Sequence, residues 1–420
     1  MSPSNQKKIL VLGGGFGGLE FCRRMKNENV TTMLVDRKNH HLFQPLLYQV
    51  ATCGLSAPQI AQPLRGILRG RSDLATYLDE IQEISLKEKW AKGRDRIYEY
   101  DYLVLAMGAQ TSYFGNNHWA KHTHGLKTLK DAIDIRTHVL KSLEKAEMEA
   151  DLEKQKKLMT FVVIGGGPTG VEMAGALAEL GRNVLHRNFR HIDPKKVRVI
   201  LVEGSEKILG NYSEPLPTSA RKQIEKLGVE VRCGDMVQDI RAGEVDVAGE
   251  TLHAGTIIWG AGVEAVPLTC QLDVPLDRAG RIKVEPDCSI PGHPEAFAIG
   301  DIVNLVDTKG KPVPGVSPAA LQMAKHVTKI IKAEIRTNGP VSPEKRKPFS
   351  YLNKGSMATI GRSKAIAEIG KLKMSGWPAW MAWLMVHIIF LVGFRNRVVV
   401  LLDWFYSYIS YRRGARVILD

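Results

Sequence analysis

The chain has 420 residues and a formal net charge of +14, with 44% hydrophobic and 24% charged side chains. This composition is typical of a globular protein of two or three domains, and it excludes a disordered or fibrous chain. Five cysteines are scattered without a C-x-x-C spacing, which excludes a disulfide scaffold or zinc ribbon, and we predict no metal site. Since the polar start MSPSNQKK lacks the apolar core of a signal peptide, we expect a reducing, cytoplasmic environment.

The first predicted unit is a strand at Lys8–Leu12, followed by the glycine turn GGGFGG at residues 13–18 and a helix. This turn satisfies the G-x-G-x-x-G pattern, in which glycines allow a tight turn and a close approach of a pyrophosphate to the helix N-terminus. The next strand, Val30–Val35, ends at Asp36, whose carboxylate can bind an adenosine ribose. We therefore predict a dinucleotide site, the alternative being a glycine-rich turn without a ligand.

A second unit repeats this pattern, with a strand at Thr160–Ile164 and the turn GGGPTG at residues 165–170. The following strand, Val197–Val202, ends at Glu203, later than in a minimal unit. We attribute the excess to a longer helix and a polar insert at His191–Lys196. An acid at this position binds a 2'-hydroxyl and repels a 2'-phosphate, which favours NAD(H) over NADP(H). The alternative is that Glu203 is a solvated residue at a strand end.

Two further segments are each predicted to form a strand and a turn, one between these units and one after them. Tyr102–Ala106 is a predicted strand with Gly108 at its exit, and Glu295–Asp301 is a predicted strand that ends in Gly-Asp. The order is thus GGGFGG, AMG, GGGPTG and AIGD along about 300 residues.

The C-terminal region is basic and apolar at once. Residues 331–420 hold fifteen Lys or Arg and five Asp or Glu, a balance of +10. Trp377–Phe394 has no ionised side chain and is followed by Arg395 and Arg397, and a second apolar stretch ends at Tyr411, Arg412 and Arg413. Basic residues beside Trp and Tyr favour anionic lipid headgroups over a nucleic acid. We therefore predict no nucleic-acid partner.

The second stretch carries a polar stripe at Asp403, Ser407 and Ser410, so we predict a helix that lies in the membrane interface. The first stretch is at the lower length limit of a membrane-spanning helix. The alternative for both is a buried or dimer-forming helix pair. We interpret His387, inside the apolar run, as a hydrogen-bonded histidine and not a metal ligand.

The ordered motifs resemble those of the two-dinucleotide flavoprotein reductases, and the finer match is to the type II NADH dehydrogenases, single-subunit NADH:quinone oxidoreductases that do not pump protons. The segments that carry this resemblance are NHHLFQPLLYQVATCGL (residues 39–55), the Glu172 that follows GGGPTGV, IIWGAGV (residues 257–263) and FRNR (residues 394–397). Related disulfide and sulfide:quinone reductases need a cysteine pair, and Cys22, Cys53 and Cys288 form no vicinal pair. We interpret Cys53 as a small buried hydrophobe.

The resemblance implies an α/β fold with two Rossmann-like domains and a C-terminal membrane-anchoring helical region. The FAD domain would comprise residues 1–127 and 271–330, the inserted NAD(H) domain residues 128–270, and the C-terminal region residues 331–420. FAD would be the cofactor and NADH a substrate. The implied binding residues are Gly13, Gly15, Phe16, Gly17, Gly18, Asp36, Arg37, Pro45, Leu46, Gln49, Ile81, Ala106, Gly108, Gly165, Gly167, Thr169, Gly170, Glu172, Glu203, Gly262, Gly300, Asp301, Ala320 and Leu321.

Two residues are candidates for the chemistry of quinone reduction. Glu172 is expected in the first turn of its helix, ionised by the helix dipole, where it would deliver protons or orient the nicotinamide; the alternative is a favourable first-turn acid. Gln322 is the polar residue left from the family's A-Q-x-A-x-Q motif, whose first two positions are Ser317 and Pro318 here. Its alternative role is to cap the helix Ala319–Ile331.

We thus predict a peripheral, monotopic flavoenzyme on the cytoplasmic side of the cell inner membrane, which passes electrons from NADH through FAD to a membrane quinone such as ubiquinone in a respiratory chain. Its partners would be NADH, the quinone and the bilayer surface, with a homodimer as an option. The competing hypothesis is a soluble NADH:acceptor reductase or redox-sensing protein whose C-terminus docks a partner protein.

Overall fold

The computed structural model describes residues 6–26, 29–185, 188–337, 339, 341–410 and 414–418. The chain divides into two compact units. Unit 1 comprises residues 1–41, 62–110 and 263–353, and unit 2 comprises residues 42–61, 111–262 and 354–420. The predicted boundaries of the cofactor-binding domains remain a prediction, because these units are defined by internal packing and not by a ligand.

Unit 1 is built on a six-stranded sheet in the order β21-β22-β9-β1-β2-β5. Its strands are parallel except for the edge strand β21, which runs antiparallel to β22. β1 and its neighbours are almost continuously apolar and buried, as expected for a parallel sheet covered on both faces. The strands are β1 (Lys7–Leu12), β2 (Val30–Asp36), β5 (Leu74–Leu78), β9 (Tyr102–Leu105), β21 (Ser289–Ile290) and β22 (His293–Ala298).

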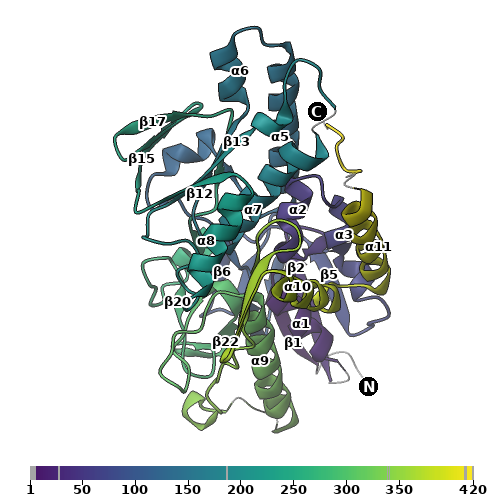
Figure 1. The fold of residues 1–420 in the computed structure, drawn as a ribbon. Helices are drawn as coiled ribbons and strands as arrows, with labels where there is room; N and C mark the ends of the chain where they lie inside the picture. The colour runs from purple at the N-terminus through teal and green to yellow at the C-terminus, as the bar shows by residue number, and fades with distance from the viewer. Residues whose placement is uncertain are drawn as a thin grey trace. The chain divides into compact units, whose positions relative to one another are not determined.

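Two helices of unit 1, α1 (Phe16–Arg24) and α9 (Ser317–Thr337), pack against each other. Both are labelled in the lower part of Figure 1. The predicted helix at Ala319–Ile331 is confirmed and is longer at both ends. The predicted strand at Glu295–Asp301 ends at Ala298, since Gly300–Ile302 forms a 3-10 turn. The remaining elements of this unit are α4 (Leu64–Ile67), β6 (Glu83–Ser85), β7 (Trp90–Lys92), β8 (Ile97–Glu99), β20 (Ile282–Lys283) and β23 (Val303–Asn304).

A cluster of buried ion pairs around Arg346 lies in the interior of unit 1. Arg346 donates from Nη1 to Asp287 Oδ2 and from Nε to Glu334 Oε1, both at 2.8 Å, and from Nη2 to the Pro294 carbonyl at 2.7 Å. Its guanidinium also lies 5.1 Å above the centre of the Phe297 ring. Each charge is thus partnered where water cannot reach it.

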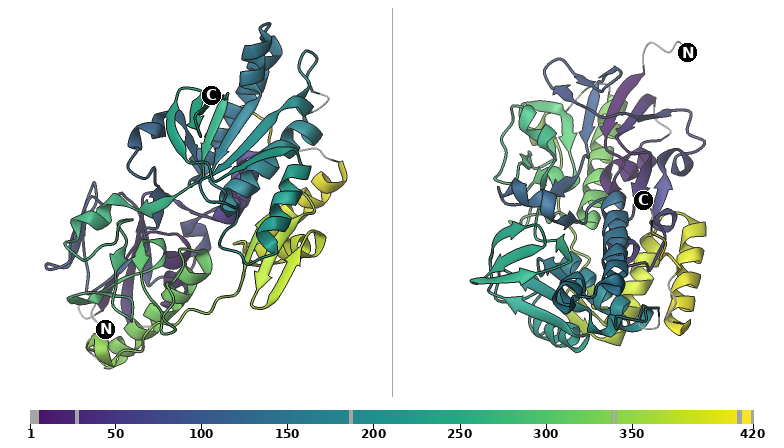
Figure 2. Two further views of the ribbon diagram at one scale, coloured as in Figure 1. Left: turned by 60° about the vertical axis from the view of Figure 1, so that its left-hand side comes forward. Right: turned by 90° about the horizontal axis from the view of Figure 1, so that it is seen from above.

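Unit 2 contains a second, five-stranded parallel sheet in the order β11-β18-β12-β13-β14. Figure 2 shows this sheet with the long helix α5 beside it. Its elements are α5 (Leu129–Met148), α6 (Leu152–Leu158), α7 (Pro168–Glu179), α8 (Leu216–Lys226), β11 (His124–Gly125), β12 (Thr160–Ile164), β13 (Arg198–Glu203), β14 (Val229–Cys233) and β18 (Thr256–Trp259). The predicted longer helix is confirmed, because α7 continues as a π turn over Leu180–Val184.

Smaller elements of unit 2 surround this sheet. They are α2 (Leu47–Ala51), α3 (Ala57–Ile60), the antiparallel sheet β15 (Val237–Arg241), β16 (Glu244–Val247) and β17 (Glu250–His253), and the antiparallel sheet β24 (Ser356–Thr359), β25 (Ala365–Ile369) and β26 (Leu372–Ser375). Among the described residues, the other short strands are β3 (His40–Leu42), β4 (Ala61–Pro63), β10 (Ala109–Thr111) and β19 (Val263–Ala265).

The C-terminal apolar region forms two helices, α10 (Trp377–Phe390) and α11 (Phe394–Ser410). The predicted eighteen-residue run is therefore interrupted at residues 391–393, where Gly393 takes a positive φ of 89°. α10 packs on β25, and α11 packs on α10 and α3 (Figure 1). Within the described ranges, no helix has the length and apolar character that would let it cross a membrane.

Candidate functional site

The glycine turn of unit 1 has two packed positions and one open position. A Cβ at Gly13 would lie 2.4 Å from the Ala106 carbonyl oxygen, and a Cβ at Gly18 would lie 1.8 Å from the Gly13 carbonyl oxygen. Gly13 also has a φ of +104°, which other residues rarely adopt. Gly15, in contrast, has an ordinary φ of −70° and no atom within 4 Å of its Cβ position. Gly15 thus leaves free space beside the backbone that a phosphate can enter.

Asp36 is fixed to this turn by its carboxylate. Its Oδ2 accepts from the Gly14 N–H at 2.5 Å, and its Oδ1 accepts from the Lys38 N–H at 2.7 Å. On the other side of the turn, His41 Nδ1 lies 3.1 Å from the Gly14 carbonyl oxygen, and the Phe16 ring meets the His41 ring edge-on at 5.0 Å. Because a carboxylate has about four lone-pair directions, Asp36 can still accept bonds from a ribose.

The glycine turn of unit 2 repeats this arrangement. A Cβ would clash at Gly165, 2.7 Å from Ala261 Cα, and at Gly170, 1.8 Å from the Gly165 carbonyl oxygen, whereas Gly167 has open space. Glu203 accepts from the Gly166 N–H at 2.5 Å through Oε2 and from the Ser205 N–H at 2.7 Å through Oε1. The acid therefore occupies the same place relative to its turn as Asp36 in unit 1.

Helices α1 and α7 begin at these two turns. Their N-cap residues are Gly15 and Gly167, and neither N-cap makes a side-chain hydrogen bond. The first N–H groups of each helix are therefore not capped by a side chain, and the helix dipole favours an anion there. Together with the open Cβ positions, these features fit one pyrophosphate at each turn.

The remaining predicted binding residues of unit 1 lie in several environments. Arg37 is half exposed, with its Nη1 3.9 Å from Glu80 Oε1, and Ile81 packs on the hydrophobic core. Gly300, at φ +79°, is opposite the Ala320 side chain, with 3.4 Å between the added Cβ and the Ala320 Cβ. Gly17 lies beside the Ile299 side chain and the Ala320 carbonyl. Gly108 has a positive φ of +74°. The side chains of Asp301 and Leu321 are half-buried.

In unit 2, the predicted binding segment around Pro45 and Leu46 forms a 3-10 turn that leads into α2. Leu46 is fully buried and Pro45 is half-buried. Thr169 is exposed near the start of α7, and Gly262 faces the Phe114 ring. The cofactor roles of these residues stay predictions, since their positions alone do not show what they bind.

The expectation that the helix dipole keeps Glu172 ionised is wrong. Glu172 is the fifth residue of α7, beyond the first turn, and the first turn contains no acid. Loss of hydration raises the pKa of Glu172 to about 8, although the Thr359 backbone N–H, 3.3 Å from Oε1, and the Thr359 side chain lower it in part. The desolvation effect is larger than both hydrogen bonds, so the carboxyl group is largely protonated at neutral pH. A proton donor is therefore available at this position.

Gln322 uses both ends of its amide on one neighbouring residue of unit 1. Its Nε2 donates to the Leu352 carbonyl at 3.0 Å, and its Oε1 accepts from the Leu352 N–H at 2.9 Å. Gln322 is the sixth residue of α9 and does not cap it. The predicted quinone contact of Gln322 remains a prediction, and the structure gives the side chain a second role in holding the segment between α9 and β24.

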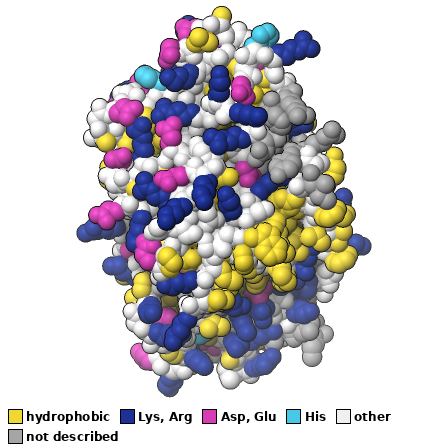
Figure 3. Space-filling view, in the orientation of Figure 1, with side chains coloured by type: hydrophobic (Ala, Val, Ile, Leu, Met, Phe, Trp, Pro, Cys, Tyr) yellow, Lys and Arg dark blue, Asp and Glu magenta, His cyan; other side chains and the backbone are white. Residues whose placement is uncertain are grey.

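α10 and α11 expose a continuous apolar face. Figure 3 shows this face as a cluster of hydrophobic side chains. Phe394 is 81% exposed and Phe405 is 66% exposed, far more than a core residue. We call this set the apolar face; it comprises Trp377, Met385, Ile389, Phe390, Phe394, Val398, Leu401, Leu402, Phe405 and Tyr406. Arg395 and Arg397 are exposed beside it, while Tyr411, Arg412 and Arg413 lie outside the described residues.

Two residues of the predicted polar stripe of α11, Asp403 and Ser407, face the body of unit 2, whereas the Ser410 hydroxyl donates to the Tyr406 carbonyl within the helix. Asp403 accepts a hydrogen bond from Gln59 on α3, and the adjacent Trp404 is buried and donates from Nε1 to Gln49 Oε1 at 2.8 Å. Ser407 lines a pocket next to α2. The helix is thus amphipathic as predicted, and its polar side anchors it to the protein. His387, as predicted, is hydrogen-bonded, with Nδ1 2.7 Å from the Trp383 carbonyl oxygen.

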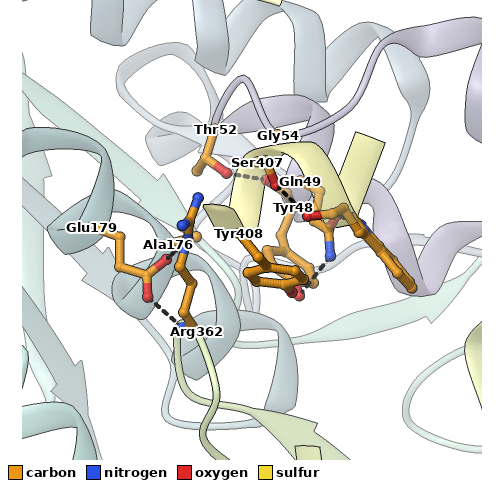
Figure 4. A pocket seen from close by; sticks show the side chains of 11 residues that line it. Tyr48, Gln49, Thr52, Gly54, Ala176, Glu179, Arg362, Ser407 and Tyr408 are labelled. Atoms are coloured by element: carbon orange, nitrogen blue, oxygen red, sulfur yellow. Dashed lines mark hydrogen bonds and ion pairs between the residues drawn. The ribbon is translucent and has the colours of Figure 1, made fainter. Parts of the chain in front are cut away.

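The pocket beside α11 is lined by residues from α2, α7, the β24–β25 turn and α11. Figure 4 shows Tyr48 and Gln49 on one side and Glu179 with Arg362 on the other. Arg362 donates its backbone N–H to Glu179, and its guanidinium lies 5.2 Å above the Tyr408 ring. Sequence reasoning missed Tyr48, Glu179 and Arg362, although Tyr48 lies inside the family segment at residues 39–55 and Glu179 is two helical turns after Glu172.

Comparison with known proteins identifies the class first. The family profile "Pyridine nucleotide-disulphide oxidoreductase" matches residues 7–324, so the chain belongs to that family. A second profile, "NDH2 C-terminal domain", matches residues 353–413. The type II NADH:quinone oxidoreductase Ndh of Mycobacterium tuberculosis is 40% identical, with all of this chain and 91% of that protein covered. This chain is therefore a member of the type II NADH:quinone oxidoreductase family.

More distant similarities agree with this assignment. The internal alternative NAD(P)H-ubiquinone oxidoreductase A1 of Arabidopsis thaliana is 28% identical over 98% of this chain and 86% of that protein. The solved structure of NDH2 from Plasmodium falciparum in complex with NADH has a TM-score of 0.90 at 20% identity, covering 99% of this chain and all of the other. At that identity, the structural match supports the fold. It confirms the predicted α/β fold with a C-terminal helical region.

Proposed function

We propose that this protein is an FAD-dependent NADH:quinone oxidoreductase that works at a membrane surface. The observation that carries the proposal is the pair of matching glycine turns, each with an open N-cap glycine and an acid fixed to its N–H groups. Two turns of this kind provide for two dinucleotides, which are FAD as the resident cofactor and NADH as the substrate. Bound FAD supplies the redox chemistry by accepting a hydride and passing two electrons to the quinone.

The residues of this chain bind and select the nucleotides. The N–H groups at the starts of α1 and α7 hold the two pyrophosphates, and Asp36 and Glu203 accept bonds from the adenosine riboses. Since the Glu203 carboxylate repels a 2'-phosphate, NADH is preferred over NADPH. Glu172, protonated at neutral pH, supplies a proton to the quinone.

The apolar face supports a location at the bilayer surface. A set of large side chains this exposed is unfavourable in water and favourable in the acyl boundary of a membrane. Arg395 and Arg397 beside the face can pair with anionic headgroups. None of the five cysteines, all of which the structure describes, forms a disulfide, which suits the reducing, NADH-containing cytoplasmic side of the inner membrane.

The catalytic part of the proposal is tested with purified protein under anaerobic conditions. We expect noncovalent FAD, bleaching of its absorbance by NADH, and recovery of the absorbance on addition of a quinone such as ubiquinone-1. A protein that holds FAD and reacts with NADH, but passes no electrons to any quinone, would instead be a soluble NADH:acceptor reductase.

The membrane part is tested by flotation with vesicles. We expect the double variant Leu402→Gln and Phe405→Gln to lose binding to phosphatidylcholine:cardiolipin vesicles. A matched control changes two residues of α5 and α6 that are even more exposed but lie outside the apolar face, Met148→Gln and Leu152→Gln, and should float like the wild type. If both double variants bound equally and the first one only lost a dimer in size-exclusion chromatography, the apolar face would be a homodimer contact.

A further inference from the structure

A chain of hydrogen bonds in unit 2 connects Glu172 with the pocket beside α11. Thr359, at the end of β24, contacts Glu172 through its backbone N–H and its side chain. Thr359 Oγ1 lies 3.0 Å from the hydroxyl oxygen of Tyr48, which lines the pocket. Gln49 Nε2 donates to the same Tyr48 oxygen at 3.1 Å, and Trp404 Nε1 donates to Gln49 Oε1 at 2.8 Å.

The direction of these hydrogen bonds follows from the chemistry of the groups. An indole N–H can only donate, so Trp404 fixes which end of the Gln49 amide is the oxygen. The Gln49 NH2 group must then donate to Tyr48, so the Tyr48 oxygen acts as an acceptor there. The Tyr48 proton is left to point at Thr359, and the Thr359 proton at Glu172. Every donor in the chain is thus directed toward the Glu172 carboxyl group.

The reaction requires such a supply of protons. Quinone reduction follows NADH + quinone + H+ → NAD+ + quinol, in which the hydride carries one proton and both electrons. The second proton comes from solvent in every turnover. If Glu172 donates it, the resulting carboxylate must be protonated again before the next turnover.

We propose that the Tyr48 and Thr359 hydroxyl groups form a relay that returns a proton from the pocket beside α11 to Glu172. Thr359 gives its hydroxyl proton to the Glu172 carboxylate, Tyr48 gives its proton to Thr359, and Tyr48 regains a proton from water in the pocket. Three O–H bonds break and three form, and one solvent proton is consumed. This inference rests on the proposed function and names the route by which its proton arrives.

Burial supports a relay through neutral hydroxyl groups. Thr359 is 2% exposed and Tyr48 is 8% exposed, so bulk water does not reach Thr359 directly. Burial raises the pKa of Tyr48 well above its usual value, so Tyr48 stays neutral and passes protons by exchange. Ser407 and Tyr408, which line the same pocket, keep part of their side chains exposed, so solvent can enter there. Tyr212 is a further titratable group that interacts with Glu172, and burial also raises the pKa of Tyr212.

The test compares acceptors that differ in their need for protons. We expect Tyr48→Phe and Thr359→Val to lower kcat for ubiquinone-1 by at least about tenfold and to raise the solvent deuterium isotope effect. Reduction of ferricyanide, which accepts electrons without protons, should stay within about twofold. Thr359→Ser keeps the hydroxyl and should restore quinone reduction. The matched control is Tyr212→Phe, which removes a buried tyrosine hydroxyl near Glu172 that is not part of the hydrogen-bonded relay. This variant should leave the rates with ubiquinone-1 and with ferricyanide unchanged.

A second readout does not depend on turnover. In infrared difference titrations of the FAD-loaded protein, the Glu172 carboxyl band is identified as the band that is absent in Glu172→Gln. In the wild type this band should disappear as the pH rises, with a midpoint near pH 8. The midpoint should rise in Thr359→Val, because this variant loses a side-chain hydrogen bond that stabilises the carboxylate. Equal losses with quinone and ferricyanide in Tyr48→Phe and Thr359→Val would show a structural role, and unchanged rates would show another proton route; either result overturns the relay. An inactive wild type with quinone would overturn the proposed function itself.

Discussion

The two N-cap glycines allow the binding of the two nucleotides to be removed separately. Gly15→Val and Gly167→Val each place a branched side chain where no atom lies within 4 Å of the Cβ position. The φ values of −70° and −71° suit valine, so we expect both variants to fold, with a loss of about 1 kcal/mol at the N-cap.

The effect on binding should be much larger than the effect on stability. The added side chain displaces the phosphates from at least two N–H donors of the helix, at about 1.5–3 kcal/mol each for bonds to a charged group. The sum of about 3–6 kcal/mol corresponds to a 10²- to 10⁴-fold weaker Kd. Gly15→Val should therefore be purified without FAD, whereas Gly167→Val should retain FAD and lose NADH binding.

The assays are the flavin absorbance of the purified variants and isothermal titration with NADH. Circular dichroism during a thermal scan confirms that each variant is folded. As a control, Gly13→Val should fail to fold, since its Cβ would lie 2.4 Å from a backbone oxygen. Full retention of FAD by a folded Gly15→Val variant, or of NADH affinity by Gly167→Val, would refute our assignment of the pyrophosphates to these turns.

Three further predictions concern selectivity, stability and the membrane. Glu203→Gln should narrow the NADH/NADPH ratio of kcat/KM by about tenfold, because the repulsion of the 2'-phosphate is lost; an unchanged ratio would assign this role to another group. Arg346→Leu leaves two buried carboxylates without their cation. It should therefore lower the free energy of unfolding of unit 1 by about 3–5 kcal/mol in urea titrations. A loss below about 1 kcal/mol would contradict the burial of these ion pairs. Arg395→Gln with Arg397→Gln should weaken vesicle binding at low salt with little effect on ferricyanide reduction, and turnover of the wild type in sealed vesicles should not acidify the lumen. Salt-independent binding or an uncoupler-sensitive acidification would contradict the interfacial anchor.

Much of the architecture could be predicted from local patterns. The strands before both glycine turns, the acids Asp36 and Glu203, and the helix after each turn occur close to where the sequence placed them. These features are encoded within about forty residues of chain, since apolar runs and glycines act through nearby backbone geometry. The amphipathic character of α11 was also visible from its spacing alone.

Tertiary structure decided the properties that depend on residues far apart in sequence. The sequence suggested an ionised Glu172 because the nearest local influence is a helix N-terminus. The fold instead places Glu172 beside Thr359 and Tyr48, 187 and 124 positions away, in surroundings that raise its pKa to about 8. In the same way, α11 turns its polar side toward α2 and α3, and this exposes the apolar face. Desolvation and side-chain pairing are set by whichever segments packing brings together, and the spacing of residues along a single segment does not contain that information.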